Sequence, residues 1–119
     1  QKAHDFKGAL KAANGIVISF AEHNGAYTTA FKNIFDWISR LDKPIWCGKP
    51  MFLLSTSTGV RGGKTVLALA HLRLSRDMPN IPCFALPSYK ETFDEEKGIT
   101  EATHLAAFNE ALEIFLKQL

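Results

Sequence analysis

Two short segments contain the residues best suited to holding a small ligand. Residues 21–26 contain an acidic side chain, an imidazole and an Asn-Gly pair, and residues 56–63 contain hydroxyl groups and three glycines. Small side chains and glycines let the backbone approach a flat polar ring closely, so that its N–H groups can donate to ring nitrogens and carbonyl oxygens. The candidate ligand-binding residues are Glu22, His23, Asn24, Gly25, Thr56, Ser57, Thr58, Gly59, Gly62 and Gly63.

The glycines of the second segment also fit a purely structural role. Gly59, Gly62 and Gly63 could do no more than shape a turn and begin a helix. One such loop alone would favour that interpretation, whereas two loops that follow consecutive strands favour a bound ligand. For Glu22, the sequence favours accepting hydrogen bonds or ordering its loop over acid–base catalysis.

Other chemistries fit the sequence less well. Ser55, Ser57 or Thr58 is a conceivable nucleophile with His23 as its base, but the sequence contains no Gly-x-Ser-x-Gly motif and no carboxylate with an evident orienting position. The four histidines are scattered singly, without metal-ligand spacing, and no Walker-type pattern ends at the glycines. We therefore expect no Ser-His nucleophile, no bound metal and no nucleoside triphosphate hydrolysis.

The apolar pattern predicts that the two segments leave neighbouring strands of a parallel sheet. Residues 15–20 and 51–55 are short apolar runs, typical of strands buried on both faces. A third run, residues 81–86, is bounded by Pro82 and Pro87, which indicates an edge strand. Because ligands of open α/β sheets bind at the carboxyl ends of the strands, we expect the two segments to lie together at that edge.

Helical spacing of apolar residues predicts helices over residues 1–13, 27–41 and 65–74, and a final helix with Thr100 as its N-cap and Glu101 in its first turn. His71 and His104 fall within helices as surface or half-buried residues. The expected buried face of the final helix consists of Leu105, Phe108, Leu112, Phe115 and Leu119. Strands that alternate with helices predict a doubly wound α/β fold.

The helix over residues 27–41 is apolar beyond a single stripe, because it also contains Phe35 and Trp37. Either this helix forms a subunit interface, or the two aromatic side chains pack under a neighbouring loop.

Composition limits the remaining function classes. The chain of 119 residues is 46% hydrophobic and has a net charge of +2, which fits one globular domain. Lys2, Lys7 and Lys11 indicate a solvated helix face, and without a basic cluster we expect no nucleic-acid partner. Cys47 and Cys83 have apolar neighbours, typical of reduced core thiols in a cytoplasmic protein. We expect no membrane association, because no apolar run is long enough to span a bilayer.

Two ordered blocks of the sequence resemble the NADPH-dependent FMN reductase family. Residues 21–25 read Ala-Glu-His-Asn-Gly and residues 31–37 read Phe-Lys-Asn-Ile-Phe-Asp-Trp; the family typically has Pro-Glu-Tyr-Asn-Gly followed by Leu-Lys-Asn-x-x-Asp-Trp. The similarity runs over nearly the whole chain. Its second block consists of residues 48–50, 55–63 and 71–73, with Phe93-Asp94 before the last helix.

This resemblance implies a flavodoxin-like, three-layer α/β/α fold in which the two loops hold the isoalloxazine ring of FMN. It also implies an NAD(P)H-dependent oxidoreductase, in which NADPH or NADH gives hydride to FMN. The electrons then pass to a small-molecule acceptor such as a quinone, an azo compound or a free flavin. A homodimer or homotetramer is implied as well. The substitutions Ala21 for Pro and His23 for Tyr reduce the stacking surface, which we expect to alter acceptor preference more than flavin binding.

The family pattern also opens with a strand and a Gly-Ser loop that binds the FMN phosphate at a helix N-terminus, and the sequence contains no matching segment. We therefore expect residues 1–119 to be the carboxyl-terminal part of a single flavodoxin-like domain, and to bind FMN weakly or not at all by themselves. The alternative function is a non-catalytic flavodoxin-like interaction or electron-transfer module. Flavin retention and NADPH oxidation in a full-length chain would distinguish the two.

Overall fold

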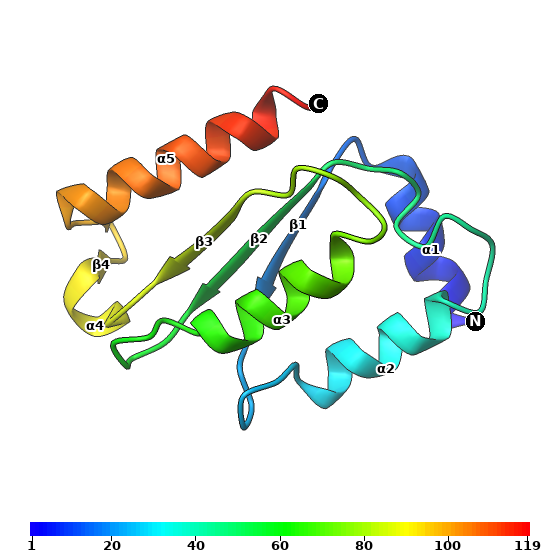
Figure 1. The fold of residues 1–119 in the computed structure, drawn as a ribbon, viewed down its shortest axis with the longest axis horizontal. Helices are drawn as coiled ribbons and strands as arrows, with labels where there is room; N and C mark the ends of the chain where they lie inside the picture. The colour runs from blue at the N-terminus through cyan, green and yellow to red at the C-terminus, as the bar shows by residue number, and fades with distance from the viewer.

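The protein, described over all 119 residues by a computed structural model, contains a three-stranded parallel sheet with helices on both faces. The strands β1 (Ile16–Phe20), β2 (Met51–Thr56) and β3 (Cys83–Leu86) lie in the order β1-β2-β3 (Figure 1). The three-layer α/β prediction is thus confirmed, as is the edge position of the third strand. The other elements are α1 (Lys2–Ala12), α2 (Thr29–Ile38), α3 (Lys64–Leu74), α4 (Tyr89–Thr92), β4 (Phe93–Asp94), β5 (Gly98–Ile99) and α5 (Ala102–Leu116).

Helix α2 is shorter than the predicted range of residues 27–41. The hydroxyl of Thr28 accepts a hydrogen bond from the backbone N–H of Phe31 at 3.1 Å, so that Thr28 is the N-cap. Tyr27 and Leu41 therefore flank the helix rather than extend it.

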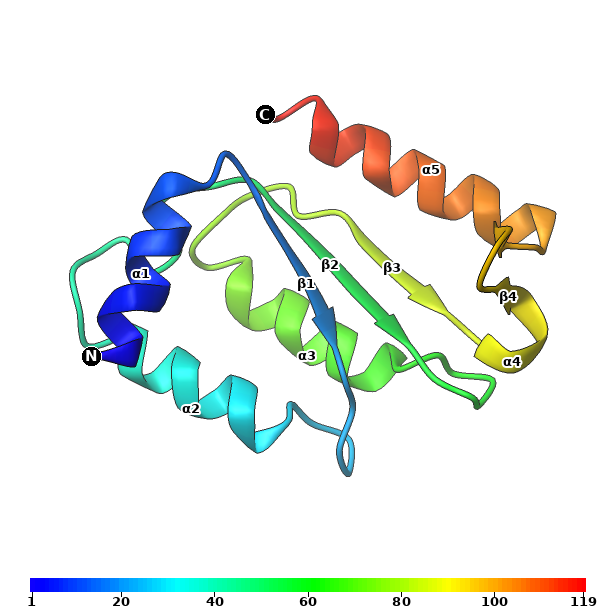
Figure 2. The ribbon, with the colours of Figure 1, turned by 180° about the vertical axis from the view of Figure 1, so that it is seen from behind.

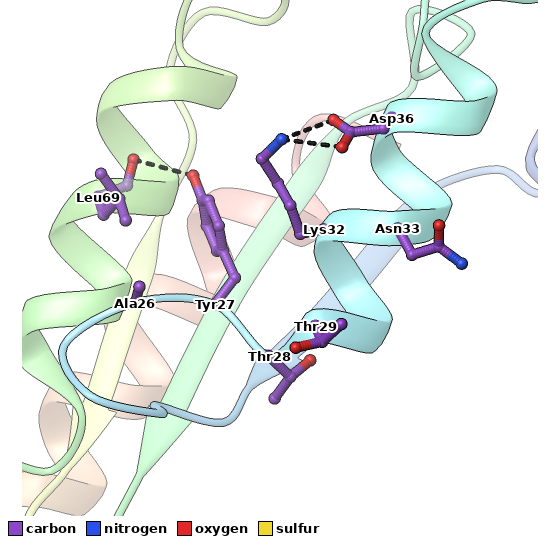
Figure 3. A pocket seen from close by; sticks show the side chains of 8 residues that line it. All are labelled: Ala26, Tyr27, Thr28, Thr29, Lys32, Asn33, Asp36 and Leu69. Carbon is purple, nitrogen blue, oxygen red and sulfur yellow. Dashed lines mark hydrogen bonds and ion pairs between the residues drawn. The ribbon is translucent and has the colours of Figure 1, made fainter.

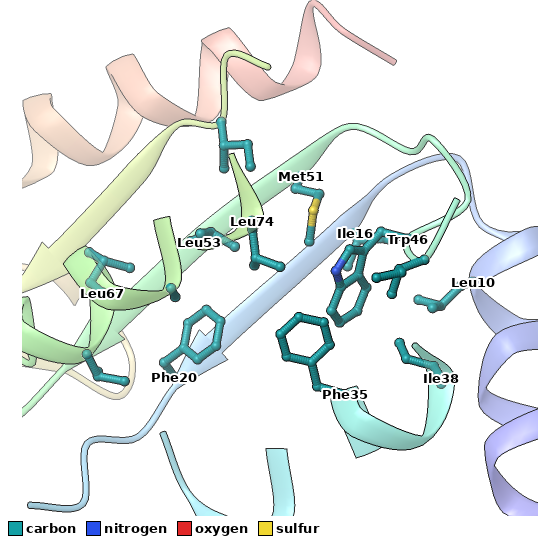
Figure 4. Packing of buried hydrophobic residues seen from close by; sticks show 14 residues of the cluster. Leu10, Ile16, Phe20, Phe35, Ile38, Trp46, Met51, Leu53, Leu67 and Leu74 are labelled. Carbon is teal, nitrogen blue, oxygen red and sulfur yellow. The ribbon is translucent and has the colours of Figure 1, made fainter. Parts of the chain in front are cut away.

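A cluster of buried apolar residues, here called the front core, lies between the sheet and helices α1, α2 and α3 (Figure 4). It consists of Leu10, Ile16, Phe20, Phe35, Ile38, Ile45, Trp46, Met51, Leu53, Val66, Leu67, Ala70, Leu74 and Ile81. The ring of Phe35 packs against Trp46 of the connector before β2, with 5.6 Å between ring centroids. Of the two alternatives, Phe35 therefore packs under a neighbouring loop, whereas 60% of Trp37 is exposed.

The back core forms where α5 covers β2 and β3. It consists of Phe52, Phe84, Leu86, Ala111 and Phe115. The predicted burial of Leu105 and Leu119 is wrong: 41% and 56% of these residues are exposed. Helix α5 packs on β2, β3 and β5, and Leu119 lies beyond its last residue, Leu116.

The prediction that the first strand is buried on both faces is also wrong. Val17 is 55% exposed and Ser19 is exposed as well, because no helix covers this face of β1 (Figure 2). The outer edge of β1 is unpaired and adjoins an apolar groove of about 490 Å³, whose walls include Phe6 and Leu10 of α1. Strand β2, in contrast, is buried on both faces, as its apolar run predicted.

Lys7 is buried, contrary to the expected solvated face, and only 3% of it is exposed. Its ammonium group donates hydrogen bonds to the carbonyl oxygens of Asp42, Pro44 and Ile45 at 2.9, 2.8 and 2.6 Å. Lys7 thus joins α1 to the connector that precedes β2. Lys2 and Lys11 are exposed, as predicted.

The N-cap of α5 is Glu101 and not Thr100. The Glu101 carboxylate accepts hydrogen bonds from the backbone N–H groups of Thr103 and His104 at 3.1 and 2.9 Å. Thr100 lies one residue before the cap, and its N–H group donates to the carbonyl of Thr92. Hydrogen bonds from the His104 and Thr103 N–H groups lower the pKa of Glu101 below its ordinary value of 4.5.

The cap makes a testable contribution to stability. A carboxyl group with a lowered pKa stabilises the fold fully above its unfolded pKa, and this contribution disappears as the pH falls through the lower, folded pKa. We expect Glu101→Ala to lower the urea midpoint near about pH 6, and the difference from wild type to shrink below about pH 4.5. Glu110→Ala, on the exposed side of the same helix, serves as the control. A difference for Glu101→Ala that does not vary with pH would contradict this explanation.

Both cysteines are half-buried and unpaired and pack against the front core. Burial raises the pKa of the Cys83 thiol to about 11. His71 is exposed and His104 is half-buried, both on helices as expected. None of the helices combines the length and the apolar character that crossing a membrane requires.

Candidate functional site

The two predicted loops lie at the same edge of the sheet. Strands β1 and β2 run parallel, with Phe20 beside Ser55, and their carboxyl ends lead directly into residues 21–26 and 57–63 (Figure 1). The expectation that both loops share this edge is confirmed.

The first loop is a tight turn. His23 and Ala26 exchange two backbone hydrogen bonds of 3.0 and 3.1 Å, and Asn24 and Gly25 between them have φ values of 53° and 78°. Two consecutive residues with positive φ are the signature of a type I′ turn, which Asn-Gly favours. The side chains of His23 and Asn24 are exposed at its tip.

Packing requires glycine at two positions of the second loop. Gly62 has φ +61°, and a Cβ atom there would lie 2.7 Å from the backbone C and O atoms of Leu86. Gly63 has φ +79°, and its Cβ would lie 2.9 Å from that of Ser55. For these two residues the structural interpretation therefore holds.

The hydroxyl groups around the second loop shape its backbone. Ser55, which is 3% exposed, donates to the carbonyl of Gly62 at 2.8 Å. Thr56 donates to the carbonyl of Leu86 at 2.8 Å, and Ser57 to that of Gly59 at 3.3 Å. Burial of Ser55 removes it as a nucleophile.

The exposed tip of the second loop offers backbone donors. The N–H groups of Thr58, Gly59 and Val60 donate to no group of the protein, and all three residues are exposed. Of the predicted residues here, Thr58 and Gly59 therefore remain available to a ligand, whereas Thr56, Gly62 and Gly63 form the support beneath them.

Sequence reasoning missed a third segment that holds this loop. The backbone N–H groups of Ser88 and Tyr89 donate to the carbonyls of Gly59 and Ser57 at 2.8 and 2.9 Å. Ser88 follows β3 and has φ +49°. The sequence could have indicated this segment, because the predicted third strand ends at the same sheet edge and is followed by Pro87.

The two loops are joined by Glu22. Its carboxylate accepts a hydrogen bond from the backbone N–H of Val66, in the first turn of α3, at 2.8 Å. The turn also approaches this helix, since a Cβ built on Gly25 would lie 3.9 Å from Cγ2 of Thr65. The prediction was that Glu22 accepts hydrogen bonds or orders its loop, and the accepted hydrogen bond is confirmed.

A groove of about 560 Å³ lies beside the turn, between α2 and α3 (Figure 3). Lys32 and Asp36 form an ion pair of 2.7 Å on its α2 side, and the hydroxyl of Tyr27 donates to the Leu69 carbonyl at 3.4 Å. Burial raises the pKa of the Tyr27 phenol above its ordinary value of 10.0.

In the first loop, the N–H groups of the exposed residues Asn24 and Gly25 also donate to no group of the protein. Exposed backbone donors on two adjoining loops fit the edge of a flat polar ring. The comparison with known proteins agrees with this chemistry, because the sequence profile of the NADPH-dependent FMN reductases matches residues 1–91. The chain belongs to this family. Its flavodoxin-like fold is supported by the flavoenzyme FerB, an NAD(P)H:(acceptor) oxidoreductase from Paracoccus denitrificans. That similarity has a TM-score of 0.79 at 21% sequence identity and covers 98% of this chain and 66% of FerB.

Curated relatives of this member of the FMN reductase family are longer than the chain itself. A 2-hydroxy-1,4-benzoquinone reductase from Burkholderia sp is 38% identical over 72 residues, which cover 60% of the chain and 38% of the relative. An NADPH:quinone oxidoreductase from Arabidopsis thaliana is 28% identical over 100 residues, or 81% of the chain and 50% of the relative. The chain thus spans about half or less of the length of these relatives.

Proposed function

We propose that the chain forms the ring-binding part of the FMN site of an NAD(P)H-dependent flavin oxidoreductase. One observation carries this proposal: two loops with free backbone donors adjoin at the carboxyl ends of neighbouring strands and are joined by the Glu22–Val66 hydrogen bond. Asn24, Thr58 and Gly59 would contact the ring edge, and His23 would border it. The remaining predicted residues would hold these loops in place.

When bound, FMN supplies the hydride chemistry of such an enzyme. The contribution of this chain is to orient the ring and to exclude water from one side of it. The acceptor class we propose is a quinone, or an azo compound or free flavin, with NADPH or NADH as donor. The curated relatives support this choice, because they include quinone reductases and an NADPH azoreductase from Bacillus sp..

Flavin binding can be tested without turnover. The chain offers ring contacts but no identified phosphate site, so we expect FMN and riboflavin to bind with dissociation constants within about threefold of each other. Quenching of flavin fluorescence during titration measures both dissociation constants. Of the two outcomes expected from the sequence, the proposed function requires weak binding, so absence of binding by either flavin would contradict it. A strong preference for FMN would place a phosphate site within these residues.

A turnover assay separates the enzyme from the alternative module. The full-length protein should catalyse the oxidation of NADPH in the presence of FMN and benzoquinone, which the loss of NADPH absorbance measures. Flavin binding without NADPH oxidation would favour an electron-transfer module instead.

We also propose that these residues belong to one larger flavodoxin-like domain. The unpaired edge of β1, the apolar groove beside it and the exposed Val17 support this, since together they match the place of a further strand and a covering helix. The greater length of the relatives agrees with it. Two unpaired cysteines support a cytoplasmic location.

A homodimer through the outer surfaces of α2 and α3 is the oligomer we propose. Both helices expose large apolar side chains there: Trp37 is 60% exposed, Leu69 38% and Leu72 73%. Tryptophan is enriched among the residues that dominate protein interfaces, so Trp37 is the expected centre of the contact.

Substituting Trp37 tests the dimer. We expect Trp37→Asp to weaken dimerisation by at least about tenfold in sedimentation velocity experiments. Leu116→Asp, which replaces an equally exposed apolar residue on α5 (53% exposed), should leave it unchanged. A wild-type chain that stays monomeric, or equal effects of the two variants, would rule out this interface.

A further inference from the structure

Helix α3 begins at a position that cannot supply its own cap. The N-cap residue is Gly63, which has no side chain to accept from the first-turn N–H groups. No capping residue could replace it, because φ is +79° and a Cβ would lie 2.9 Å from Ser55 Cβ. The geometry that brings the second loop close to β2 thus leaves the helix in need of an acceptor from elsewhere.

That acceptor comes from the first loop. The Glu22 carboxylate lies 44 positions earlier in the chain and accepts from the N–H of Val66, the third residue of the helix, at 2.8 Å. This is the bond that an N-cap side chain ordinarily makes. A carboxylate also interacts favourably with the positive end of the helix. Val66 itself is fully buried, so its backbone is fixed within the front core.

We propose that Glu22 is a positioning residue, which makes the order of the His23–Ala26 turn depend on the first turn of α3. Glu22 immediately precedes the turn, and its side chain bonds to a backbone that cannot move. The carboxylate therefore serves two purposes: it caps α3, and it fixes the direction in which His23 and Asn24 project. The two loops then behave as one cooperative unit.

Hydrogen exchange of the flavin-free protein tests this coupling directly. Glu22→Ala should accelerate exchange of the Val66 amide, and also that of the His23 and Ala26 amides, each by about tenfold. The N–H group of each turn residue donates to the carbonyl of the other and not to the Glu22 side chain, so faster exchange of these two amides reports coupling. Glu22→Gln keeps an acceptor oxygen and should restore most of the protection. Glu110→Ala, an exposed glutamate of α5, should change none of these rates.

Two results would overturn the proposal: acceleration at Val66 alone, which would make the cap a local feature, or no acceleration at any of the three amides. If Glu22→Ala does not fold, Glu22→Asp provides the same test, because its shorter side chain would not reach Val66 from the same backbone. Circular dichroism establishes which variants are folded.

The consequence for the ligand rests on the proposed function. We expect Glu22→Ala to raise the dissociation constant for riboflavin by about tenfold, and Glu22→Gln to raise it much less. Equal affinities of wild type and Glu22→Ala would show that the turn does not position the ring. A wild-type chain that binds no flavin would contradict the proposed function, while the exchange rates would still decide whether Glu22 couples the loops.

Discussion

Replacing Gly62 with alanine is expected to lower the free energy of unfolding by about 3–4 kcal/mol. The left-handed backbone conformation costs a non-glycine residue about 1 kcal/mol. The rest comes from steric overlap, since the new Cβ would lie 2.7 Å from the backbone C and O atoms of Leu86. Backbone atoms at the end of a strand cannot rotate away as a flexible side chain would, so the second loop must shift.

Gly48 provides the matched control for this substitution. Its φ is +66°, close to that of Gly62, but no atom lies within 4 Å of the position its Cβ would take. Gly48→Ala should therefore lower the free energy of unfolding by only about 1 kcal/mol. Urea denaturation of both variants measures the difference, and equal costs would show that the overlap at Leu86 is relieved without penalty.

The second large effect is expected from Lys7→Met, which should lower the free energy of unfolding by about 3 kcal/mol. Methionine is unbranched and replaces the apolar stem of lysine without its terminal ammonium group, so it donates no hydrogen bond. The carbonyl oxygens of Asp42, Pro44 and Ile45 would each lose a donor. Replacing a buried charge is often harmless when its partner is replaced as well, but here three acceptors would remain in place.

Lys11 supplies the control for Lys7. It lies on the same helix and forms an ion pair of 2.9 Å with the side chain of Asp42, but both side chains are more than half exposed. Ion pairs in such positions contribute little, so Lys11→Met should leave the urea midpoint nearly unchanged. If the two lysine variants lost equal stability, burial of Lys7 would not be the cause of its effect.

Short-range patterns predicted the elements of the fold well. Apolar runs identified the three strands, and their alternation with helices predicted the sheet and the edge at which both loops lie. The Asn-Gly pair likewise indicated the turn that the structure shows between His23 and Ala26. These features depend on the chain's local preferences, which the sequence displays directly.

Long-range contacts account for most of what the sequence could not predict. The acceptors of Lys7 lie 35 to 38 positions away, so a helical pattern alone could not distinguish this lysine from its exposed neighbours. Exposure of Val17 depends on where α5 docks, which its own periodicity does not determine. The cap of α5 is a different case, because Thr100 and Glu101 are adjacent and both suit the position.

The glycines of the second loop show how an argument from composition can be only partly right. Gly62 and Gly63 are required by close packing whether or not a ligand binds, so their presence is no evidence for FMN. A Cβ on Gly59 would make only an ordinary contact of 3.8 Å with Ser57 Oγ, and Gly59 lies at the exposed tip. Of the three glycines, it is the one that bears on the ligand.

The open edge of β1 has a consequence for handling the protein. An unpaired strand presents a row of N–H and C=O groups that can template a strand from another molecule, and natural proteins usually protect such edges with charges or prolines. The strand Ile16–Phe20 has neither, and it carries the exposed Val17. In concentrated solution this strand is the natural starting point for aggregation, and a lysine at position 17 is the simplest protection against it.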